Sequence, residues 1–439
     1  MPSDSFRILL PLPAQGAAET EATIVQWHVA TGDAFSKGQV LAQVDSAKSV
    51  FDFEAPCDGQ VVEIRHQAEE TVSYEEAVIE IETSDASMKD WIPPAASAPE
   101  FEAPPTAAPA VVPAAAGTVK CSIAGVGACL PTRVVTNAEL IKGFADISEQ
   151  YIQQVTGVRQ RHWIGDDEKP SDLAYAAALD AIKSAQIATD DIDAIVLATA
   201  TPDVAMPSTA CILQQRLGLR PVPAFDLNAA CSGWLYALTM ARSMIASGMA
   251  KNVLTVGVDV QSRLLDRTDY TTCFLFGDGA GAAVVSAGDQ GHQLHQTLLG
   301  ADASGLQLAR RSAPGFVTNP TEGSADPWIR MDGHALFRVA AESFAHLIRD
   351  AAESTGWSLD EINWVVPHQA NARILKTAAK RCGIPFDRFF MNVDHVGNTS
   401  SASIPLAMVE MQDALSAGDK LVLCSVGAGI TTAAVTLQW

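Results

Sequence analysis

Basic residues are scarce in this sequence. Its 439 residues include 29 Lys and Arg against 51 Asp and Glu, which gives a formal net charge of −22 at pH 7. Because nucleic-acid binding needs clustered cations that neutralise phosphates, this charge argues against a nucleic-acid partner. The same charge argues against an anionic membrane surface as a partner. The sequence therefore indicates a soluble protein that acts on neither class of polyanion.

Long hydrophobic runs and paired cysteines are also missing. No stretch reaches the roughly 18 apolar residues of a membrane-spanning helix. The first residues, MPSDSFRILLPLP, lack the basic region of a secretory signal. Eight cysteines in a chain of this length, without paired spacing, indicate thiols in a reducing compartment rather than a disulfide framework. We predict a cytoplasmic protein without a metal site.

A proline- and alanine-rich stretch divides the chain. Residues 93–116 read PPAASAPEFEAPPTAAPAVVPAAA and contain seven Pro and ten Ala. Such a segment cannot bury a core, and its prolines favour an extended polyproline II conformation. We therefore predict a small domain over residues 1–85, a linker over residues 86–117 and a larger region from residue 118 onward.

The two sides of the linker differ in hydrophobic pattern. Before it, stretches such as ATIVQWHV and AVIEIET alternate apolar and polar residues, which is typical of half-buried strands and predicts a small all-β module. After it, apolar stretches such as DAIVLATA and NVLTVGVD alternate with amphipathic ones such as CSGWLYALTMARSMIASG. This alternation of strands and helices predicts an α/β region.

One lysine stands between two strand-like stretches of the small module. Residues 45–50 read DSAKSV, with Lys48 where a hairpin tip is expected. With LPLPAQG before it and AP followed by Gly59 after it, this module resembles a lipoyl/biotinyl domain. The resemblance implies a flattened barrel of two small sheets that carries a covalent cofactor on Lys48. A hairpin tip presents the amine to a ligase, and the modified arm can then move between active sites.

The neighbours of Lys48 favour lipoate over biotin. Biotin carriers usually place methionines on both sides of the lysine, whereas Ala47 and Ser49 stand here. Some lipoyl domains of branched-chain 2-oxoacid dehydrogenases have Ala before the lysine, as this sequence does. The resemblance implies a lipoate ligase and the decarboxylase component of a 2-oxoacid dehydrogenase as partners. The alternative is a degenerate domain whose lysine stays unmodified.

Three polar residues in the larger region are candidates for catalysis. FDLNAACSGWLYAL places Cys231 where a strand gives way to a helix, and exposed N–H groups at a helix start favour a thiolate with a lowered pKa. VVPHQANARIL places His368 just after an apolar strand, and DHVGNTSSASIP places Asn398 in a glycine-containing turn. GDGAGA at residues 277–282 lacks the lysine and the spacing of a phosphate loop, so we predict close backbone packing there.

Taken together, these stretches resemble ketoacyl-acyl-carrier-protein synthase III of the thiolase superfamily. Further landmarks are GVGACLPTRVVTN, TGVRQRHW, HQANARI and VGAGIT. One Cys, one His and one Asn match the initiating type of synthase rather than thiolase or the elongating synthases. The resemblance implies a layered αβαβα fold of two similar halves, which we place at residues 118–290 and 291–439.

The resemblance also implies a mechanism. Cys231 takes an acyl group from a thioester donor, and its own N–H and that of Ala428 bind the oxyanion. His368 and Asn398 then stabilise the enolate formed when malonyl-acyl-carrier protein loses carbon dioxide. The carbanion attacks the acylated Cys231 and gives a 3-oxoacyl-carrier protein. An acyltransferase of the same fold that never condenses is an open alternative, as is a non-condensing partner subunit.

Partner surfaces follow from charge and from the same resemblance. Arg373, Lys376 and Lys380 recur on one face of the predicted helix after His368, with Arg381 adjacent, and we predict that they dock acidic acyl-carrier protein. We also expect a homodimer. In its relatives a Phe from the partner subunit often enters the acyl pocket, and Met206 stands at that position.

The sequence departs from the family where coenzyme A is usually bound. A Trp on the adenine and two Arg on the phosphates are usual, but Tyr151, Val155 and Tyr270 stand at those positions. A weakened coenzyme A entrance next to a carrier domain suggests that an acyl group on lipoyl-Lys48 primes Cys231. The alternative is a conventional synthase primed by acyl-coenzyme A, with a vestigial carrier domain.

Overall fold

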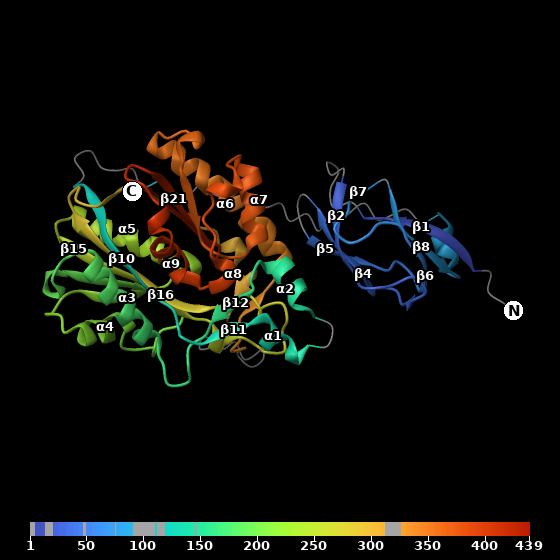
Figure 1. Cartoon of the computed structure of the whole chain (residues 1–439), viewed down its shortest axis with the longest axis horizontal. Helices are drawn as coiled ribbons and strands as arrows, with labels where there is room; N and C mark the ends of the chain where they lie inside the picture. Colours follow the sequence, from blue (N-terminus) through green and yellow to red (C-terminus); the bar gives the residue numbers. More distant parts are fainter. Residues whose placement is uncertain are drawn as a thin grey trace. The chain divides into compact units, whose positions relative to one another are not determined.

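The computed structural model describes residues 5–13, 21–46, 50–74, 76–90, 110–111, 119–144, 147–311 and 326–439. Lys48, with its neighbours Ala47 and Ser49, lies outside the described residues. The chain separates into two compact units, Met1–Pro105 and Thr106–Trp439 (Figure 1). Within the described residues, no helix is both long enough and apolar enough to cross a membrane.

The first unit is built from short antiparallel strands, as the alternating pattern predicts. Two four-stranded sheets have the orders β1-β8-β6-β3 and β5-β4-β2-β7. The apolar residues of both sheets share one core, which includes Ile24, Leu41 and Ile81. The strands are β1 (Phe6–Pro11), β2 (Glu21–Trp27), β3 (Ala34–Phe35), β4 (Val40–Ser46), β5 (Val50–Glu54), β6 (Gly59–Ile64), β7 (Thr71–Ser73) and β8 (Ala77–Thr83).

Parts of the predicted linker have regular structure. Ala86–Asp90 form a 3-10 helix (η1) at the end of the first unit. Ala110 and Val111 form β9, which pairs with Leu299 and Leu298 of strand β17 (His292–Ala301) in the second unit. Ala110–Val111 are therefore already part of the sheet of the second unit, although its first long strand, β10, begins only at Cys121. The predicted domain boundaries themselves stay a prediction.

The second unit alternates strands and helices. Its other strands are β10 (Cys121–Cys129), β11 (Val134–Thr136), β12 (Gln160–His162), β13 (Ala194–Ala198), β14 (Ala224–Leu227), β15 (Asn252–Val260), β16 (Asp278–Ala287), β18 (Ala309–Arg310), β19 (Arg330–Met331), β20 (Trp364–Pro367), β21 (Lys420–Gly427) and β22 (Thr431–Gln438). Its helices are α1 (Asn137–Leu140), α2 (Glu149–Thr156), α3 (Pro170–Ser184), α4 (Thr209–Leu217), α5 (Gly233–Ala246), α6 (Gly333–Thr355), α7 (Ala372–Cys382), α8 (Val393–Val396) and α9 (Ser403–Glu410).

The strand order shows two similar halves. The main sheet runs β14-β13-β15-β16-β10-β17-β22-β21-β20. Read outward from the β10–β17 junction, β10-β16-β15-β13 in one half corresponds to β17-β22-β21-β20 in the other. In each half, a helix (α3 or α6) comes after the strand at the junction (β10 or β17). Another helix (α5 or α9) comes before the hairpin of the last two strands (β15–β16 or β21–β22). The prediction of two similar α/β halves is confirmed.

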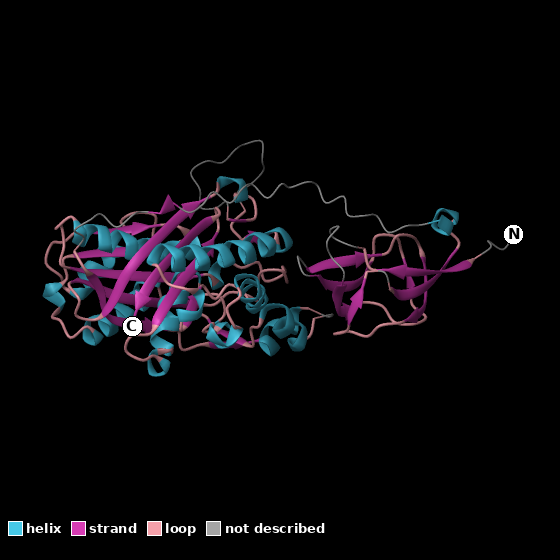
Figure 2. Ribbon diagram, turned by 90° about the horizontal axis from the view of Figure 1, so that it is seen from above, coloured by secondary structure: helices cyan, strands magenta, loops and turns pink. Residues whose placement is uncertain are grey.

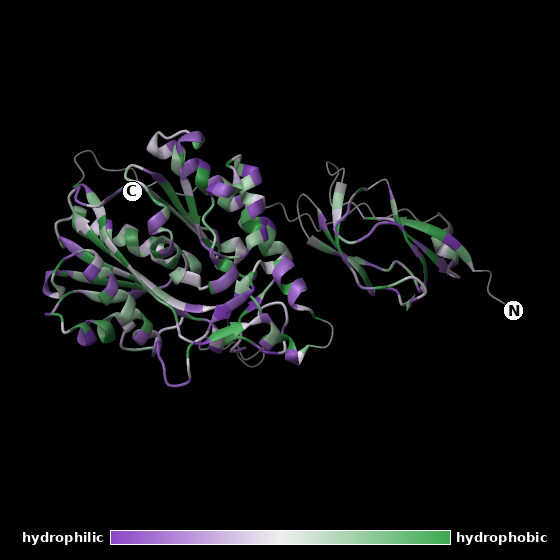
Figure 3. Ribbon diagram, viewed as in Figure 1, coloured by the Kyte–Doolittle hydropathy of each residue, from purple (hydrophilic) through white to green (hydrophobic). Residues whose placement is uncertain are grey.

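The halves enclose a central helical layer. Trp234 and Leu238 of α5 share one buried core with Ile404 and Met408 of α9 and with strands from both halves. Helices α3 and α4 pack on the outer face of one half, and α6 and α7 on that of the other. Figure 2 shows helices on both faces of the strands, and α6 and α7 carry both hydrophilic and hydrophobic residues in Figure 3. This is the layered αβαβα arrangement that the sequence predicts.

Candidate active site

Cys231 lies in a tight turn between a strand and a buried helix. Strand β14 ends at Leu227, the 3-10 helix η4 covers Ala230–Ser232, and α5 begins at Gly233. Ala230, directly before the cysteine, has a φ of 47°, in the left-handed region that non-glycine residues rarely adopt. Its N–H donates to Asn228 Oδ1 at 3.0 Å. A strained backbone beside a thiol is typical of a functional site, because the surrounding structure must hold it in place.

A glycine at the end of β21 lets a second backbone segment approach this turn. A Cβ atom on Gly427 would lie 2.9 Å from the backbone nitrogen of Cys231 and 3.0 Å from that of Ser232. Thr431 Oγ1 donates to Ala229 O at 2.8 Å, which ties the same segment to the turn. Ala428 therefore directly follows a glycine that has no room for a side chain beside the backbone nitrogen of Cys231.

His368 is connected to Cys231 through two neighbouring residues of β21. Its N–H donates to Cys424 O at 2.8 Å, and the hydroxyl of Ser425 donates to Cys231 O at 3.0 Å. The His368 side chain is buried, and its Nδ1 has no hydrogen-bond partner within the described part of the chain. A buried nitrogen without a partner is uncommon and indicates a group that is kept for a ligand.

Asn398 is connected to Cys231 from the other side. Asn398 Oδ1 accepts from the N–H of Ser400 at 2.9 Å, and Ser400 Oγ lies 3.6 Å from Cys231 Sγ. Since the oxygen of the Asn398 amide is engaged, its NH₂ group is available as a donor. Hydrogen bonds thus link the His368 backbone and the Asn398 side chain to Cys231 through residues of β21 and through Ser400, and up to 194 residues separate contacting partners.

A buried carboxylate holds the segment that carries Ser400. Asp259, at the end of β15, accepts from the N–H of Ser401 at 3.0 Å and from its hydroxyl at 2.7 Å. A Cβ atom on Gly257 would lie 2.4 Å from Ser401 O, so only glycine allows this approach. Ser400 itself has a φ of 53°. The position of Asn398 and Ser400 therefore depends on strand β15.

Burial controls the electrostatics of the thiol. It raises the pKa of Cys231 to about 11, the hydrogen bond from Ser400 opposes this rise, and the charge of Asp259 adds to it. The prediction of a lowered thiol pKa at the helix start is therefore wrong in direction. The physical reason is that the loss of water around the sulfur disfavours the thiolate more than the local donors favour it.

Burial also keeps His368 neutral. It lowers the pKa of this histidine to about 3, because the imidazolium loses its hydration without gaining a counter-charge. A neutral imidazole carries one N–H donor and one bare nitrogen. At neutral pH His368 can therefore donate a hydrogen bond to an oxygen, as the predicted role requires, but it carries no charge.

A groove opens beside the N-terminal end of α7, four residues after His368. It has a volume of about 430 Å³ and is lined by Gln150, Gln153, Gln154, Gly157, Ala372, Arg373 and Lys376. Helices α2 and α7 are joined at its base, where Asn371 Nδ2 donates to Val155 O at 2.9 Å. The lining of this groove begins four residues after His368 in the chain, and we take the groove as part of the entrance to the candidate active site.

Three of the four predicted docking residues point to the outside of α7. Lys376 and Lys380 are exposed, and Arg373 is half-buried at the groove. We call these three residues the α7 basic face. Arg381 does not belong to it, because its Nη1 forms an ion pair of 2.6 Å with Glu342.

The positions that depart from the coenzyme A pattern lie on α2 and on an adjacent loop. Tyr151 and Val155 are part of α2, and Ile152 between them packs against Cys273 and Phe274. Cys273 and Phe274 belong to the loop that contains Tyr270, whose side chain is 53% exposed. Helix α2 thus packs against the loop that carries Tyr270, and none of the three positions supplies a cation.

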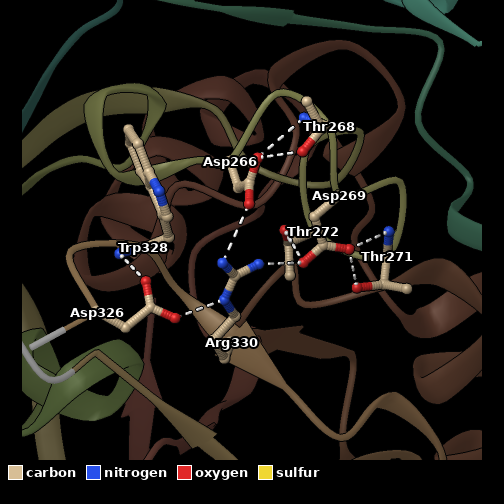
Figure 4. A network of polar contacts seen from close by, with 8 residues as sticks. All are labelled: Asp266, Thr268, Asp269, Thr271, Thr272, Asp326, Trp328 and Arg330. Carbon is tan, nitrogen blue, oxygen red and sulfur yellow. Dashed lines mark hydrogen bonds and ion pairs between the residues drawn. The ribbon is translucent and has the colours of Figure 1, made fainter. Parts of the chain in front are cut away.

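The loop with Tyr270 is held by one arginine and several acids. Figure 4 shows Arg330 between Asp326, Asp266 and Asp269, at 2.7, 3.0 and 3.2 Å. The carboxylates raise the pKa of Arg330 and keep it charged. Arg330 is thus fully engaged by carboxylates and is not free to bind a phosphate.

Met206 does not line a pocket in its own chain, because 86% of its side chain is exposed. It lies on the segment before α4, whose first N–H groups, those of Thr209 and Ala210, donate to Asp226 of β14. Strand β14 is the last strand on its side of the described sheet, so its outer edge is available for pairing. Met206 and this edge lie on the same side of the unit.

Sequence reasoning missed several residues that support the site. Ser400 is within the stretch that also provides Asn398, and Asp259 is a polar residue at the carboxyl end of a buried strand, where ligand sites are common in α/β sheets. Ser425 is likewise a polar residue near the carboxyl end of a buried strand, and Gly427 lies within the landmark VGAGIT. The predicted close packing of GDGAGA is confirmed, since Cβ atoms on Gly277 and Gly281 would lie 2.1 and 2.6 Å from residues of the α8–α9 region.

Comparisons with known proteins agree with the fold of the two units. Family models for 3-oxoacyl-[acyl-carrier-protein] synthase III match residues 225–303 and, for its C-terminal part, 352–439, and a model described as biotin-requiring enzyme matches residues 9–81. The β-ketoacyl-[acyl-carrier-protein] synthase III of Neisseria gonorrhoeae is 42% identical over 320 residues, which cover 72% of this chain and 98% of that protein. The crystal structure of 3-oxoacyl-[acyl-carrier-protein] synthase III from Aquifex aeolicus is 38% identical, with a TM-score of 0.68, over 73% of this chain and all of that one. A priming β-ketosynthase from the R1128 polyketide biosynthetic pathway is 32% identical, with the same TM-score of 0.68, over 73% of this chain and 96% of that one.

Proposed function

This chain belongs to the 3-oxoacyl-acyl-carrier-protein synthase III family of condensing acyltransferases and carries a biotin/lipoyl-type domain before the synthase; from this premise we propose that Cys231, His368 and Asn398 catalyse its reaction. In the first step Cys231 Sγ attacks the carbonyl carbon of an acyl thioester. The thioester C–S bond breaks, and the donor leaves as a thiol with the proton of Cys231. The N–H groups of Cys231 and Ala428 stabilise the oxyanion, a contribution typically of about 3–4 kcal/mol per donor.

In the second step malonyl-acyl-carrier protein enters. His368 and the amide of Asn398 donate hydrogen bonds to its thioester oxygen. Carbon dioxide leaves, the electron pair moves onto the enolate, and its carbon attacks the acyl carbon on Cys231. The thiol is released and a 3-oxoacyl-carrier protein forms. Because His368 is neutral and Asn398 has its oxygen engaged by Ser400, both side chains are suited to donate at this point.

The observation that carries this proposal is the pair of contacts that Cys231 makes. Ser400, which is hydrogen-bonded to Asn398, contacts its sulfur, and Ser425, next to the residue that binds the His368 backbone, contacts its carbonyl oxygen. The direct test is an assay with an acyl thioester and malonyl-acyl-carrier protein. We expect an acyl adduct on Cys231, carbon dioxide and a 3-oxoacyl-carrier protein. An adduct that forms and passes to a small acceptor without release of carbon dioxide would instead identify a transferase that does not condense.

The α7 basic face is proposed to dock acidic acyl-carrier protein. Lys376→Glu combined with Lys380→Glu should raise the KM for malonyl-acyl-carrier protein roughly tenfold and flatten its salt dependence, since exposed charges act mainly on association. Reaction with a small malonyl thioester should not change. Lys183→Glu with Lys251→Glu, which reverses two exposed lysines elsewhere on the same unit, is the control. Equal losses with both substrates would contradict the docking role.

Lys48 is proposed to carry lipoate. The residue lies outside the described residues, but strands β4 and β5 on either side of it pair antiparallel, with Asp45 opposite Val50, which fits a hairpin that presents a lysine. A bound lipoyl group would supply, once its disulfide is reduced by the decarboxylase reaction that acylates it, a dihydrolipoyl thiol that holds the acyl group as a thioester. Cys231 would take its acyl group from that thioester, and the decarboxylase of a 2-oxoacid dehydrogenase would be the source. A lipoate ligase is the second partner that this proposal requires.

The entrance supports priming without coenzyme A. Val155 and Tyr270 offer no cation to the phosphates of coenzyme A, and Arg330, which binds the loop of Tyr270, is occupied by three carboxylates. Each missing charged hydrogen bond lowers affinity by about 1.5–3 kcal/mol. A tethered donor tolerates this loss, because its effective concentration is in the millimolar range.

A homodimer is proposed on the edge of β14. Pairing of two such edges would bury Met206 of each subunit against the other, which explains why so apolar a side chain is 86% exposed in one chain. Methionine is flexible and fits irregular pockets, so we propose that it admits branched or medium-length acyl groups. The cytoplasm stays the predicted compartment.

A further inference from the structure

The hydroxyl of Ser400 contacts the sulfur of Cys231 directly. Ser400 Oγ donates to Cys231 Sγ at 3.6 Å, and within the described residues this is the one side-chain hydrogen bond that reaches the sulfur. Ser400 is buried, so little water competes with its hydroxyl for the contact. A hydrogen-bond donor is therefore in place at the atom that reacts in the proposed acylation.

The backbone holds this hydroxyl in a position that a serine rarely adopts. Ser400 has a φ of 53°, and such strain persists only where the surroundings enforce it. The N–H of Ser400 donates to Asn398 Oδ1 at 2.9 Å. On its other side, the N–H and hydroxyl of Ser401 donate to Asp259 at 3.0 and 2.7 Å. These contacts fix the Ser400 side chain before a substrate binds, as a catalytic donor requires.

Cys231 needs such a donor because its other surroundings disfavour the thiolate. Burial raises the pKa of the thiol to about 11, and the charge of Asp259 adds to this rise. Burial also lowers the pKa of His368 to about 3, so a neutral His368 cannot form an ion pair with the thiolate. The hydrogen bond from Ser400 opposes the rise in the pKa of Cys231, since a donor stabilises the charged form of its acceptor.

We propose that Ser400 is a further catalytic residue, whose hydroxyl stabilises the attacking sulfur of Cys231 during acylation. This inference rests on the proposed acylation of Cys231 and adds the group that activates its thiol. Ser400 itself neither gains nor loses a proton. Sγ bonds to the acyl carbon, the donor C–S bond breaks, and the proton of Cys231 leaves with the donor thiol. During condensation Ser400 contributes only its backbone N–H, which holds Asn398 Oδ1.

The first test measures the reactivity of the thiol in the full chain. Iodoacetamide alkylates the thiolate, and peptide mass spectrometry separates Cys231 from the exposed Cys211. We expect Ser400→Ala and Ser400→Gly to slow alkylation of Cys231 roughly tenfold between pH 7 and pH 9. This is the lower end of the range for a hydrogen bond to a charged group, because sulfur is a weak acceptor. Glycine adopts a positive φ without strain, so Ser400→Gly removes the hydroxyl and spares the backbone.

The second test separates the two steps of the reaction. With the N-acetylcysteamine thioesters of acetate and isobutyrate as donors, both variants should acylate roughly tenfold more slowly than wild type. Once fully acylated, they should release carbon dioxide from malonyl-acyl-carrier protein at the wild-type rate, because the N–H of residue 400 still holds Asn398. Ser243→Ala is the control, since it removes a hydroxyl that donates to Thr239 O within α5, and all its rates should equal those of wild type.

Wild-type alkylation rates in both Ser400 variants would overturn the inference and leave the proposed function intact. An equal loss of acylation and condensation would identify Ser400 as a structural residue and would overturn the inference as well. If Ser400→Ala fails to fold, Ser400→Gly decides between these results. If wild type takes an acyl group from neither donor, the proposed function is overturned, and slowed alkylation in the variants then supports only the contact with the thiolate.

Discussion

Cys231→Ser is expected to abolish the acyl-enzyme, whereas His368→Ala is expected to keep acylation and lose condensation. The two variants differ because Cys231 is the acceptor in the first step, while His368 contributes a donor only when the malonyl thioester becomes an enolate. Removal of such a donor typically lowers the rate by roughly two to three orders of magnitude. Intact mass spectrometry measures acylation, and release of carbon dioxide from malonyl-acyl-carrier protein measures condensation. Cys211→Ser, which changes an exposed thiol of the same chain, is the control for labelling.

The pH dependence of the two steps sharpens this expectation. Burial raises the pKa of Cys231 to about 11, so acylation should accelerate as pH rises from 6 to 9, in proportion to the thiolate. Burial lowers the pKa of His368 to about 3, so condensation on pre-acylated enzyme should show no titration near the ordinary histidine value. A condensation rate that falls as a group near pH 6.5 titrates would contradict a neutral His368. A His368→Ala variant that condenses at the wild-type rate would remove its role altogether.

Local features of the sequence predicted the fold well and placed Cys231 at a strand-to-helix turn, while the catalytic roles of Cys231, His368 and Asn398 stay a prediction. The alternation in ATIVQWHV and AVIEIET corresponds to β2 and β8, and the change of pattern around Cys231 corresponds to the end of β14 and the start of α5. Such features depend on neighbours in the chain, where periodicity and turn residues carry the information.

The remainder depends on contacts between distant residues. Ser400 touches Cys231 across 169 positions, and Asp259 binds Ser401 across 142, so no local pattern marks them as partners. The direction of the Cys231 pKa was missed for the same reason, because burial is a property of the packed fold. The pairing of Arg381 with Glu342, 39 positions away, likewise removed one cation from the predicted docking face.

Lys48→Arg is expected to remove the advantage of a donor carried on the chain itself. Holo-protein acylated on its N-terminal domain should label Cys231 much faster than free acyl-coenzyme A at micromolar concentration. The reason is that a tethered donor has an effective concentration in the millimolar range, roughly a thousandfold above that of the free thioester. The lost cations at positions 155 and 270 matter little to such a donor, because it needs no tight binding. Lys37→Arg, at an exposed lysine of the same unit, is the control.

The length of the tether supports this expectation. Because Ala110 and Val111 pair with β17, the chain is bound to the synthase unit before the end of the predicted linker. At about 3.1 Å per residue, the segment from residue 91 to residue 109 spans at most roughly 60 Å, and a lipoyl-lysine arm adds about 14 Å. A shorter tether confines the donor to a smaller volume and raises its effective concentration, as long as it spans the distance.

Mixing two full-length variants separates tethered from free transfer. A Cys231→Ser chain can be acylated on its N-terminal domain but has no acceptor thiol, and a Lys48→Arg chain has the thiol but no attachment site. Mixed after assembly, the pair should transfer slowly and in proportion to concentration, whereas wild type should transfer at a rate independent of concentration. If Lys48→Arg and wild type acylate identically from every donor, the N-terminal domain takes no part in priming, and Cys231 must obtain its acyl group through an entrance that lacks the usual cations.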